Sequence, residues 1–195
     1  METPLEQTRT HARNQLGNAG SHGMDHTELV TRLCRIIGNS EDADMDIFIP
    51  AALLHDIARP CEKEHRLPHE EKGAQMAETF LVSIHYNALL IPAICAAIRT
   101  HRFRSNKHPE RLEAVILSGA DKLDDLEAVG SARTVMRAAG HGGSMDDAVQ
   151  HFHDKLLKLK DCMYTHAMRE IAREPHAFLE RFLAALAEET GNSFP

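Results

Sequence analysis

The sequence predicts an all-α protein. Apolar residues recur at helical spacing along most of the chain, and alternating strand patterns are essentially absent. The 195 residues, of which 43% are hydrophobic and 26% charged, suit one globular domain that buries roughly 70% of the surface its unfolded chain exposes. We expect about seven to nine helices, a loosely ordered segment over residues 1–20, and a single domain over residues 21–195.

The expected helices follow one another along the chain, each with an apolar stripe. The first carries Leu29, Leu33 and Ile37 and stops at Gly38. The next, over 46–58, is apolar on nearly every side, so it is expected to be buried, with Pro50 tolerated only near its first turn. Further helices are expected over 69–83, 91–101, 109–123 and 131–139, and the C-terminal part (146–190) should hold a long helix through 149–163 and a last one through 178–186.

Charge and motifs exclude several classes of protein. Lys+Arg is 22 and Asp+Glu is 29, a formal charge of -7, which argues against binding to a nucleic-acid polymer and against a helix-turn-helix DNA binder. No apolar stretch approaches the length of a membrane span, and the acidic N-terminus has no apolar signal-peptide core. The four cysteines form no CxxC pair, as in a reduced, cytoplasmic protein. Neither the GxSxG motif of serine hydrolases nor the P-loop motif occurs.

Histidine is unusually frequent, with fourteen histidines beside two tyrosines and no tryptophan. Four places put metal-ligand side chains where packing favours apolar ones: His26 in the first helix, His55-Asp56 at the end of the most buried run, His101, and Asp121. A buried carboxylate costs several kcal/mol unless it is paired or coordinates an ion. Taken singly, each residue is compatible with a core histidine or a helix cap. One metal ion between helix ends accounts for all of them together.

The order His, His-Asp, Asp resembles the HD superfamily of metal-dependent phosphohydrolases, most closely its small stand-alone hydrolases. The residues that carry the resemblance are His26 in MDHT (24–27), His55 and Asp56 in ALLHDI (52–57), and Asp121 in ADKLD (120–124). Further matches are His69 in PHEEKGA (68–74) and the segment AVGSAR (128–133). The similarity covers about residues 21–135.

This resemblance implies a multi-helical HD-domain bundle with a divalent metal bound by His26, His55, Asp56 and Asp121. Mn, Fe, Co, Ni and Zn suit two imidazoles and two carboxylates, and Mg is a further candidate. Such an ion lowers the pKa of its bound water, in favourable cases from about 15.7 to about 7. The implied reaction is hydrolysis of a phosphomonoester or pyrophosphate bond in a small phosphorylated molecule such as a nucleotide, with Asp56 assisting the attacking water.

Several neighbouring residues are assigned supporting roles. His69 and Lys122 are predicted to be catalytic, and the predicted substrate contacts are His101, Arg104, Arg133 and His22. His69 and His101 match positions that bind a second metal or touch phosphate in some HD proteins. Members with two metals often have two adjacent histidines where this chain has His101 and an arginine, which favours one ion. Arg133 has a second interpretation, as a brace for the ADKLD turn.

Two other functions stay open. A di-iron oxygenase with the same fold would need His69 and His101 as additional ligands. A non-catalytic regulatory module would keep the metal for structure alone. We expect no membrane and no nucleic-acid polymer among the partners, and a homo-oligomer is compatible with the sequence.

Overall fold

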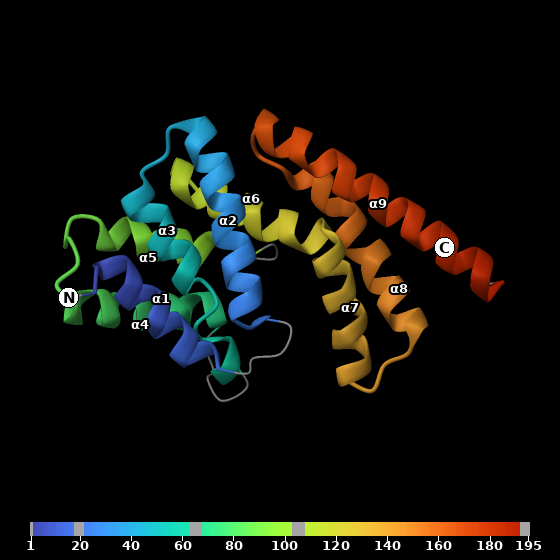
Figure 1. Cartoon of the computed structure of the whole chain (residues 1–195), viewed down its shortest axis with the longest axis horizontal. Coiled ribbons are helices and arrows are strands. Elements are labelled where there is room, and N and C mark those ends of the chain that lie inside the picture. Colours follow the sequence, from blue (N-terminus) through green and yellow to red (C-terminus); the bar gives the residue numbers. More distant parts are fainter. Residues whose placement is uncertain (1, 18–21, 63–67, 103–107, 192–195) are drawn as a thin grey trace. The chain divides into compact units, whose positions relative to one another are not determined.

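The computed structural model describes residues 2–17, 22–62, 68–102 and 108–191, and within these ranges it contains nine α-helices and no strand (Figure 1). The all-α prediction is confirmed. The structure divides into two compact units, Met1–Asp121 and Lys122–Pro195, and the single domain expected over 21–195 stays a prediction. Helix α6 (Leu112–Leu126) begins in the first unit and ends in the second. Within the described part of the chain, each helix is too short or too polar to cross a bilayer.

The first helix, α1 (Pro4–Leu16), corrects the expectation that residues 1–20 are loosely ordered. Thr3 and Glu6 form a capping box, in which each side chain accepts a hydrogen bond from the other residue's backbone N–H. Thr8, Ala12 and Leu16 are buried, and their four-residue spacing puts them on one face of the helix. The order of this segment therefore comes from a cap and a short buried stripe.

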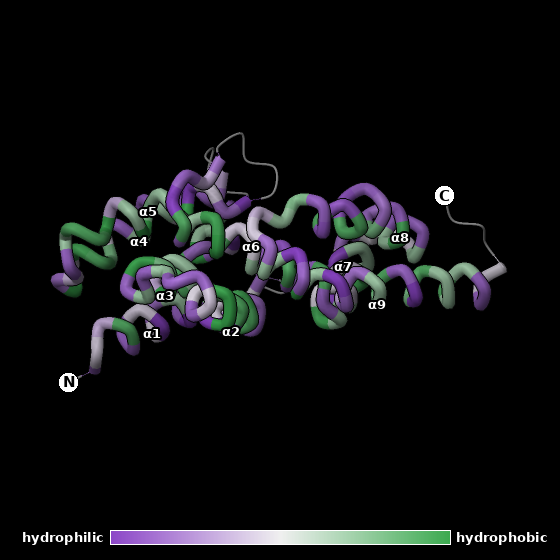
Figure 2. The backbone as a smooth tube through the Cα atoms, turned by 90° about the horizontal axis from the view of Figure 1, so that it is seen from above, coloured by the Kyte–Doolittle hydropathy of each residue, from purple (hydrophilic) through white to green (hydrophobic). Residues whose placement is uncertain are grey.

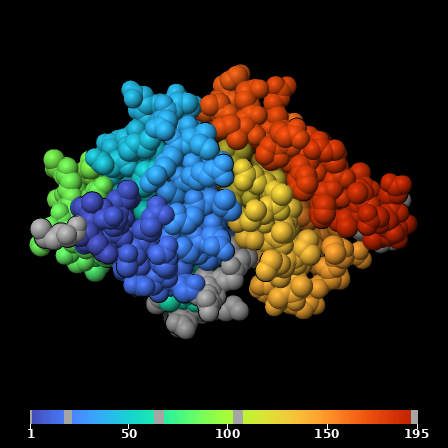
Figure 3. Space-filling model, viewed as in Figure 1, coloured from blue at the N-terminus to red at the C-terminus, as the bar shows by residue number. Residues whose placement is uncertain are grey.

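Helices α2 (Met24–Glu41) and α3 (Met45–Leu54) form the centre of the first unit. Every residue of α3 from Ile47 to Leu54 is buried, as expected for a helix that is apolar on all sides. The two helices approach closely at Gly38, where any side chain would collide with the ring of Phe48. On the face shown in Figure 3, α1 lies beside α2.

Pro50 lies inside α3, beyond its first turn, which the sequence analysis did not expect. A proline has no N–H, so the carbonyl of Asp46 loses the partner that an α-helix would provide. The Tyr86 hydroxyl donates to this carbonyl at 2.6 Å and replaces the missing hydrogen bond. Helix α3 ends at Leu54 and the chain continues as turns, where the sequence predicted helix to residue 58. A short 3₁₀ helix, η2 (Arg59–Cys61), follows.

Helices α4 (His69–Ser83) and α5 (Ile91–Thr100) complete the first unit close to the predicted bounds. Both pack on α3, and they pack on each other. Each begins or ends at a histidine, His69 as the first residue of α4 and His101 directly after α5.

The second unit contains the end of α6, then α7 (Ala128–Gly140), α8 (Met145–Asp154), the 3₁₀ helix η3 (Leu156–Cys162) and α9 (His166–Thr190). The long helix predicted through 149–163 is wrong, because the backbone leaves α-helical geometry at Lys155. Gly130 in α7 lies so close to the carbonyls of Asp124 and Asp125 that no side chain fits there. The tube of α9 alternates between hydrophilic and hydrophobic in Figure 2, as in an amphipathic helix.

Candidate metal centre

Helix ends bring the predicted ligands of the first unit together. His26 lies in the first turn of α2, His55 and Asp56 follow α3, and Asp121 lies in α6. The His26, His55 and Asp56 side chains are at most 2% exposed, and that of Asp121 is 20% exposed. The polar cluster is therefore almost entirely shielded from solvent.

The distances within this cluster are those of a metal-binding group. The Nε2 atoms of His26 and His55 are 3.2 Å apart, and the Oδ1 atom of Asp121 lies 3.4 Å and 4.0 Å from them. The Oδ2 atom of Asp56 lies 3.6 Å from the first and 3.7 Å from the second. His26, His55 and Asp121 form a group able to hold a metal ion. The four predicted ligands thus converge, and their assignment to one ion stays a prediction.

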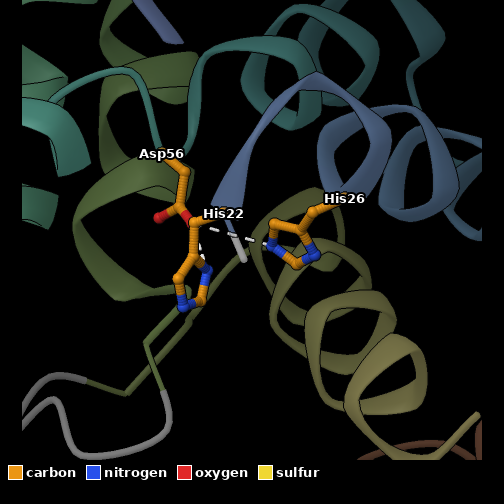
Figure 4. A group of neighbouring side chains, drawn as sticks. All are labelled: His22, His26 and Asp56. Atoms are coloured by element: carbon orange, nitrogen blue, oxygen red, sulfur yellow. Dashed lines mark ion pairs between the residues drawn. The ribbon is translucent and has the colours of Figure 1, made fainter. Parts of the chain in front are cut away.

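His22 joins the same side of the site from the residues just before α2. Its Nδ1 atom lies 3.1 Å from Oδ2 of Asp56, and its ring meets that of His26 edge-on, 5.3 Å between centroids. Figure 4 shows the carboxylate of Asp56 directed at these two imidazoles. His22, predicted as a substrate contact, also belongs to a possible ligand group with His26 and Asp56.

The other oxygen of Asp56 has different neighbours. The Nε2 atoms of His69 and His101 lie 3.4 Å and 3.5 Å from Oδ1, and Nε of Arg59 donates to it at 3.1 Å. Both histidines are buried. Imidazoles thus approach both oxygens of Asp56, and His55, Asp56 and His101 form a further group able to hold a metal ion.

Backbone carbonyls fix the tautomers of two histidines. Nδ1 of His55 lies 2.7 Å from the carbonyl of Ala52, and Nδ1 of His101 lies 2.6 Å from that of Ile98. A carbonyl oxygen only accepts, so both Nδ1 atoms carry a proton, and in the neutral form of each ring the Nε2 atom presents a lone pair to the site. Metal-ligating histidines are commonly held in this way.

Burial and neighbouring charges favour neutral imidazoles at His55 and His69, beside ionised carboxylates at Asp56 and Asp121. Burial lowers the pKa of His55 to about 4, although Asp56 opposes the shift. Burial alone would raise the pKa of Asp56 and of Asp121, but the surrounding histidines, and Arg59 beside Asp56, hold both pKa values well below the usual range. Burial also lowers the pKa of His69, to about 4. A metal ion requires deprotonated ligands of these two kinds.

His101 is the exception in this cluster. Its burial favours the neutral form, but the hydrogen bond and charge of Asp56 outweigh burial and raise the pKa of His101. The imidazole of His101 thus tends toward its charged form, in contrast to that of His55.

Two buried polar atoms support the fit of a cation. Oδ2 of Asp56 lies within 4 Å of three imidazoles but makes no hydrogen bond in the described structure, and Nε2 of His69 also has none. Buried polar atoms are nearly always paired, and a cation would satisfy this oxygen. The mixture of imidazole and carboxylate donors suits a divalent transition metal. The residues present therefore fit the ion that the sequence predicts.

Arg59, to which the sequence assigned no role, supports the site together with Glu62, whose place just after the His-Asp pair makes it a possible general base. Oε1 of Glu62 lies 3.0 Å from Nδ1 of His69, and Nη1 of Arg59 donates to the other oxygen of Glu62 at 3.2 Å. Residues 56, 59 and 62 are spaced three apart. In a helical turn, side chains at this spacing are neighbours, so each can contact the next. That spacing, in the stretch directly after the His-Asp pair, is the signal that could have identified them.

The remaining predicted residues lie in the second unit or outside the described residues. Lys122 is buried, with Nζ 3.4 Å from the Tyr164 hydroxyl and 4.6 Å from the centre of its ring. Arg133 binds the carboxylate of Asp124, as the bracing interpretation expects. Arg104 lies outside the described residues. The catalytic role of Lys122 and the substrate role of Arg133 stay predictions.

Comparison with known proteins shows the family of this chain. Residues 23–126 match the family model of the HD domain. The chain belongs to the HD-domain family. HD domains bind divalent metals, and the His/Asp cluster of this HD protein is able to hold one. The uncharacterized protein YpgQ of Bacillus subtilis is 35% identical over 190 residues, which cover 94% of this chain and 92% of YpgQ.

Solved structures agree with this family. A crystal structure of Bacillus subtilis YpgQ in complex with ADP superposes with a TM-score of 0.80 at 29% identity, covering 95% of this chain and 97% of that one. The crystal structure of a predicted HD-superfamily hydrolase from an uncultured Thermotogales bacterium gives a TM-score of 0.71 at 26% identity, covering 93% of this chain and 90% of that one.

A sequence relative matches a smaller part of the chain. Ribonuclease Y of Clostridium perfringens is 27% identical over 104 residues, which are 53% of this chain and 18% of that enzyme.

Proposed function

We propose that this HD protein is a metal-dependent phosphohydrolase that cleaves a phosphomonoester or pyrophosphate bond of a nucleotide or a similar small molecule. The observation that carries the proposal is the buried carboxylate of Asp56, whose Oδ2 atom has three imidazoles within 4 Å and no hydrogen bond. Hydrolysis is the activity named for HD-superfamily relatives of this fold.

The division of roles follows from the contacts. His26, His55, Asp56 and Asp121 would hold the ion, which when bound supplies a water of lowered pKa and neutralises charge on the phosphoryl group. Phosphoryl transfer needs little beyond such positioning and charge stabilisation. Asp56, ionised by its surroundings, is placed to orient the attacking water.

His69 is the acceptor that we propose for the proton of that water. Its Nδ1 is directed at Glu62 (3.0 Å), so its Nε2, which has no hydrogen bond in the described structure and lies 3.4 Å from Asp56, is the atom able to accept a proton. The Glu62 carboxylate would then stabilise the imidazolium, as a carboxylate does for the histidine of a hydrolase triad.

The substrate class rests on three observations. ADP is bound in the crystal structure of YpgQ, the formal charge of -7 disfavours a long polyanion, and His101 and His22 line the site beside Asp56. The sequence offers Arg104, Lys122 and Arg133 as further cationic candidates for phosphate contacts. We therefore propose a small phosphorylated substrate rather than a nucleic-acid polymer.

The test is a substrate panel on the chelator-treated protein after Mn²⁺ is restored. Nucleoside mono-, di- and triphosphates, simple phosphomonoesters and a short RNA would be incubated, and phosphate, pyrophosphate and oligonucleotide products resolved by chromatography. We expect metal-dependent release from a nucleotide, and its loss in Asp121→Asn. The matched control is Asp161→Asn, because Asp161 is exposed in the second unit.

Three outcomes would contradict the proposal. Cleavage of RNA alone would indicate a polymer substrate, as the name of ribonuclease Y states for that protein. Two bound irons with oxygen consumption and no phosphate release would favour the di-iron oxygenase, for which His69 and His101 lie close enough to Asp56 to serve as ligands. Bound metal without turnover of any substrate would favour a regulatory module.

A further inference from the structure

The Oδ1 atom of Asp56 has the surroundings of a second metal site, except for one residue. Nε2 of His69 and Nε2 of His101 approach it at 3.4 Å and 3.5 Å, and the two rings meet edge-on at 5.4 Å. A bridging carboxylate oxygen and two imidazoles would form most of the coordination of a second divalent ion. The third neighbour is Nε of Arg59 at 3.1 Å, which is a donor and cannot ligate.

Arg59 is held firmly in this position. Its Nη1 donates to Glu62 at 3.2 Å, and Glu62 in turn contacts Nδ1 of His69 at 3.0 Å. Together with Asp56, these residues form a ring of close contacts in which carboxylates alternate with nitrogen-bearing side chains. The guanidinium is therefore fixed at both ends, and displacing it would break two ion pairs.

The charge of this guanidinium is permanent. An arginine side chain stays protonated in proteins, and the carboxylates of Asp56 and Glu62 lie against this one. A divalent ion between Oδ1 and the two histidines would lie beside this positive charge, inside a largely buried cluster where screening by water is weak.

We propose that the guanidinium of Arg59 takes the place of a second metal ion on Asp56 and so limits the centre to one ion. This inference rests on the metal centre of the proposed function. It makes Arg59 a positioning residue, which leaves His69 and His101 available to substrate and proton instead of to metal.

The decisive variant is Arg59→Met, which removes the charge and keeps an unbranched side chain. The chelator-treated proteins would be loaded with Mn²⁺, freed of excess ion and measured by elemental analysis, with electron paramagnetic resonance to detect an exchange-coupled pair. We expect one ion per parent chain and two per Arg59→Met chain, with the coupled signal in the variant alone. Circular dichroism would verify that each variant is folded.

Three further variants separate charge from structure. Arg59→Lys restores a cation and should return the count to one. Arg35→Met is the matched control, because Arg35 is an exposed arginine of the same unit, and it should leave the count at one. His69→Gln added to Arg59→Met should also return one ion, because it removes a ligand of the second position.

The outcomes distinguish this inference from the proposed function. Two ions in the parent, or one in folded Arg59→Met, would overturn the role of Arg59 and leave the metal centre intact. No ion in the parent would refute the metal centre itself. If Arg59→Met does not fold, Arg59→Gln would be judged by the same counts, since it also removes the charge.

Discussion

The two units of this HD protein each bury an aspartate that binds an arginine guanidinium, and the two aspartates differ in their remaining neighbours. Asp56 in the first unit has His22, His26 and His55 around its Oδ2 atom. Asp124 in the second unit is fully buried and binds the guanidinium of Arg133. Both aspartates are thus buried, but the side chains around them differ in chemistry.

The difference shows what separates a metal site from a structural ion pair. A guanidinium is a permanent donor with no lone pair, so it neutralises a carboxylate and cannot share an ion with it. Imidazoles held in a fixed tautomer offer lone pairs, and several of them around one carboxylate form a ligand set. A buried His-Asp pair therefore indicates a metal site only when further imidazoles converge on it.

The largest expected effect is on metal affinity, and it should appear in one unit alone. Asp56→Asn removes a charged ligand and should weaken Mn²⁺ binding by more than about 100-fold, because even the loss of a residue that merely orients a ligand typically costs 10- to 100-fold. Asp124→Asn should leave the affinity unchanged. Isothermal titration calorimetry of the two variants and the parent checks this.

Asp124→Asn has its own expected cost. Removing one partner of a buried ion pair leaves the other uncompensated, so urea denaturation should show a loss of about 3 kcal/mol in the free energy of unfolding. A variant that instead lost its metal at unchanged stability would show that Asp124 belongs to the metal centre and that the contrast between the two aspartates is mistaken.

An intermediate effect concerns pH in the metal-free protein. The pKa values of His55 and His69 are about 4 in the folded chain, against 6.5 ordinarily, because burial disfavours their charged forms. Between these values the unfolded state binds more protons, so stability is full above pH 6.5 and is lost as pH falls toward 4. His101, with a raised pKa, acts in the opposite sense.

Urea denaturation of the chelator-treated protein across this range of pH measures the effect. Two histidines with lowered pKa against one with raised pKa should give a net fall in stability toward acid. His69→Gln should make the dependence shallower. A free energy of unfolding that stays constant from pH 6.5 to pH 4 would contradict the neutral, buried state of these imidazoles.

The smallest effect should be equal in the two units. Thr3→Ala and Ser144→Ala each remove a capping box, at the start of α1 and of α8. Each should lower the free energy of unfolding by about 1 kcal/mol, measured by urea denaturation. A negligible loss for Thr3→Ala beside a full loss for Ser144→Ala would mean that α1 adds little to the stability of the first unit.

Sequence reasoning was strongest where a local pattern is sufficient. Helices α4 and α5 were predicted nearly to the residue, because an apolar stripe and terminal Ser, Pro and His residues mark them. It failed where the pattern is weak or interrupted. The stripe of α1 has only three buried residues, and the apolar spacing through 149–163 continues across the break at Lys155, so it did not reveal the end of α8.

The sequence by itself determined the helical class and the family, and it pointed to the His and Asp residues proposed for the site, because all of these depend on residue types in a recognisable order. Only the tertiary structure decided which atom faces which. It placed Arg59 on one oxygen of Asp56 and three imidazoles around the other. These contacts join residues from the ends of different helices, and the direction of a side chain there depends on packing between elements distant in the chain.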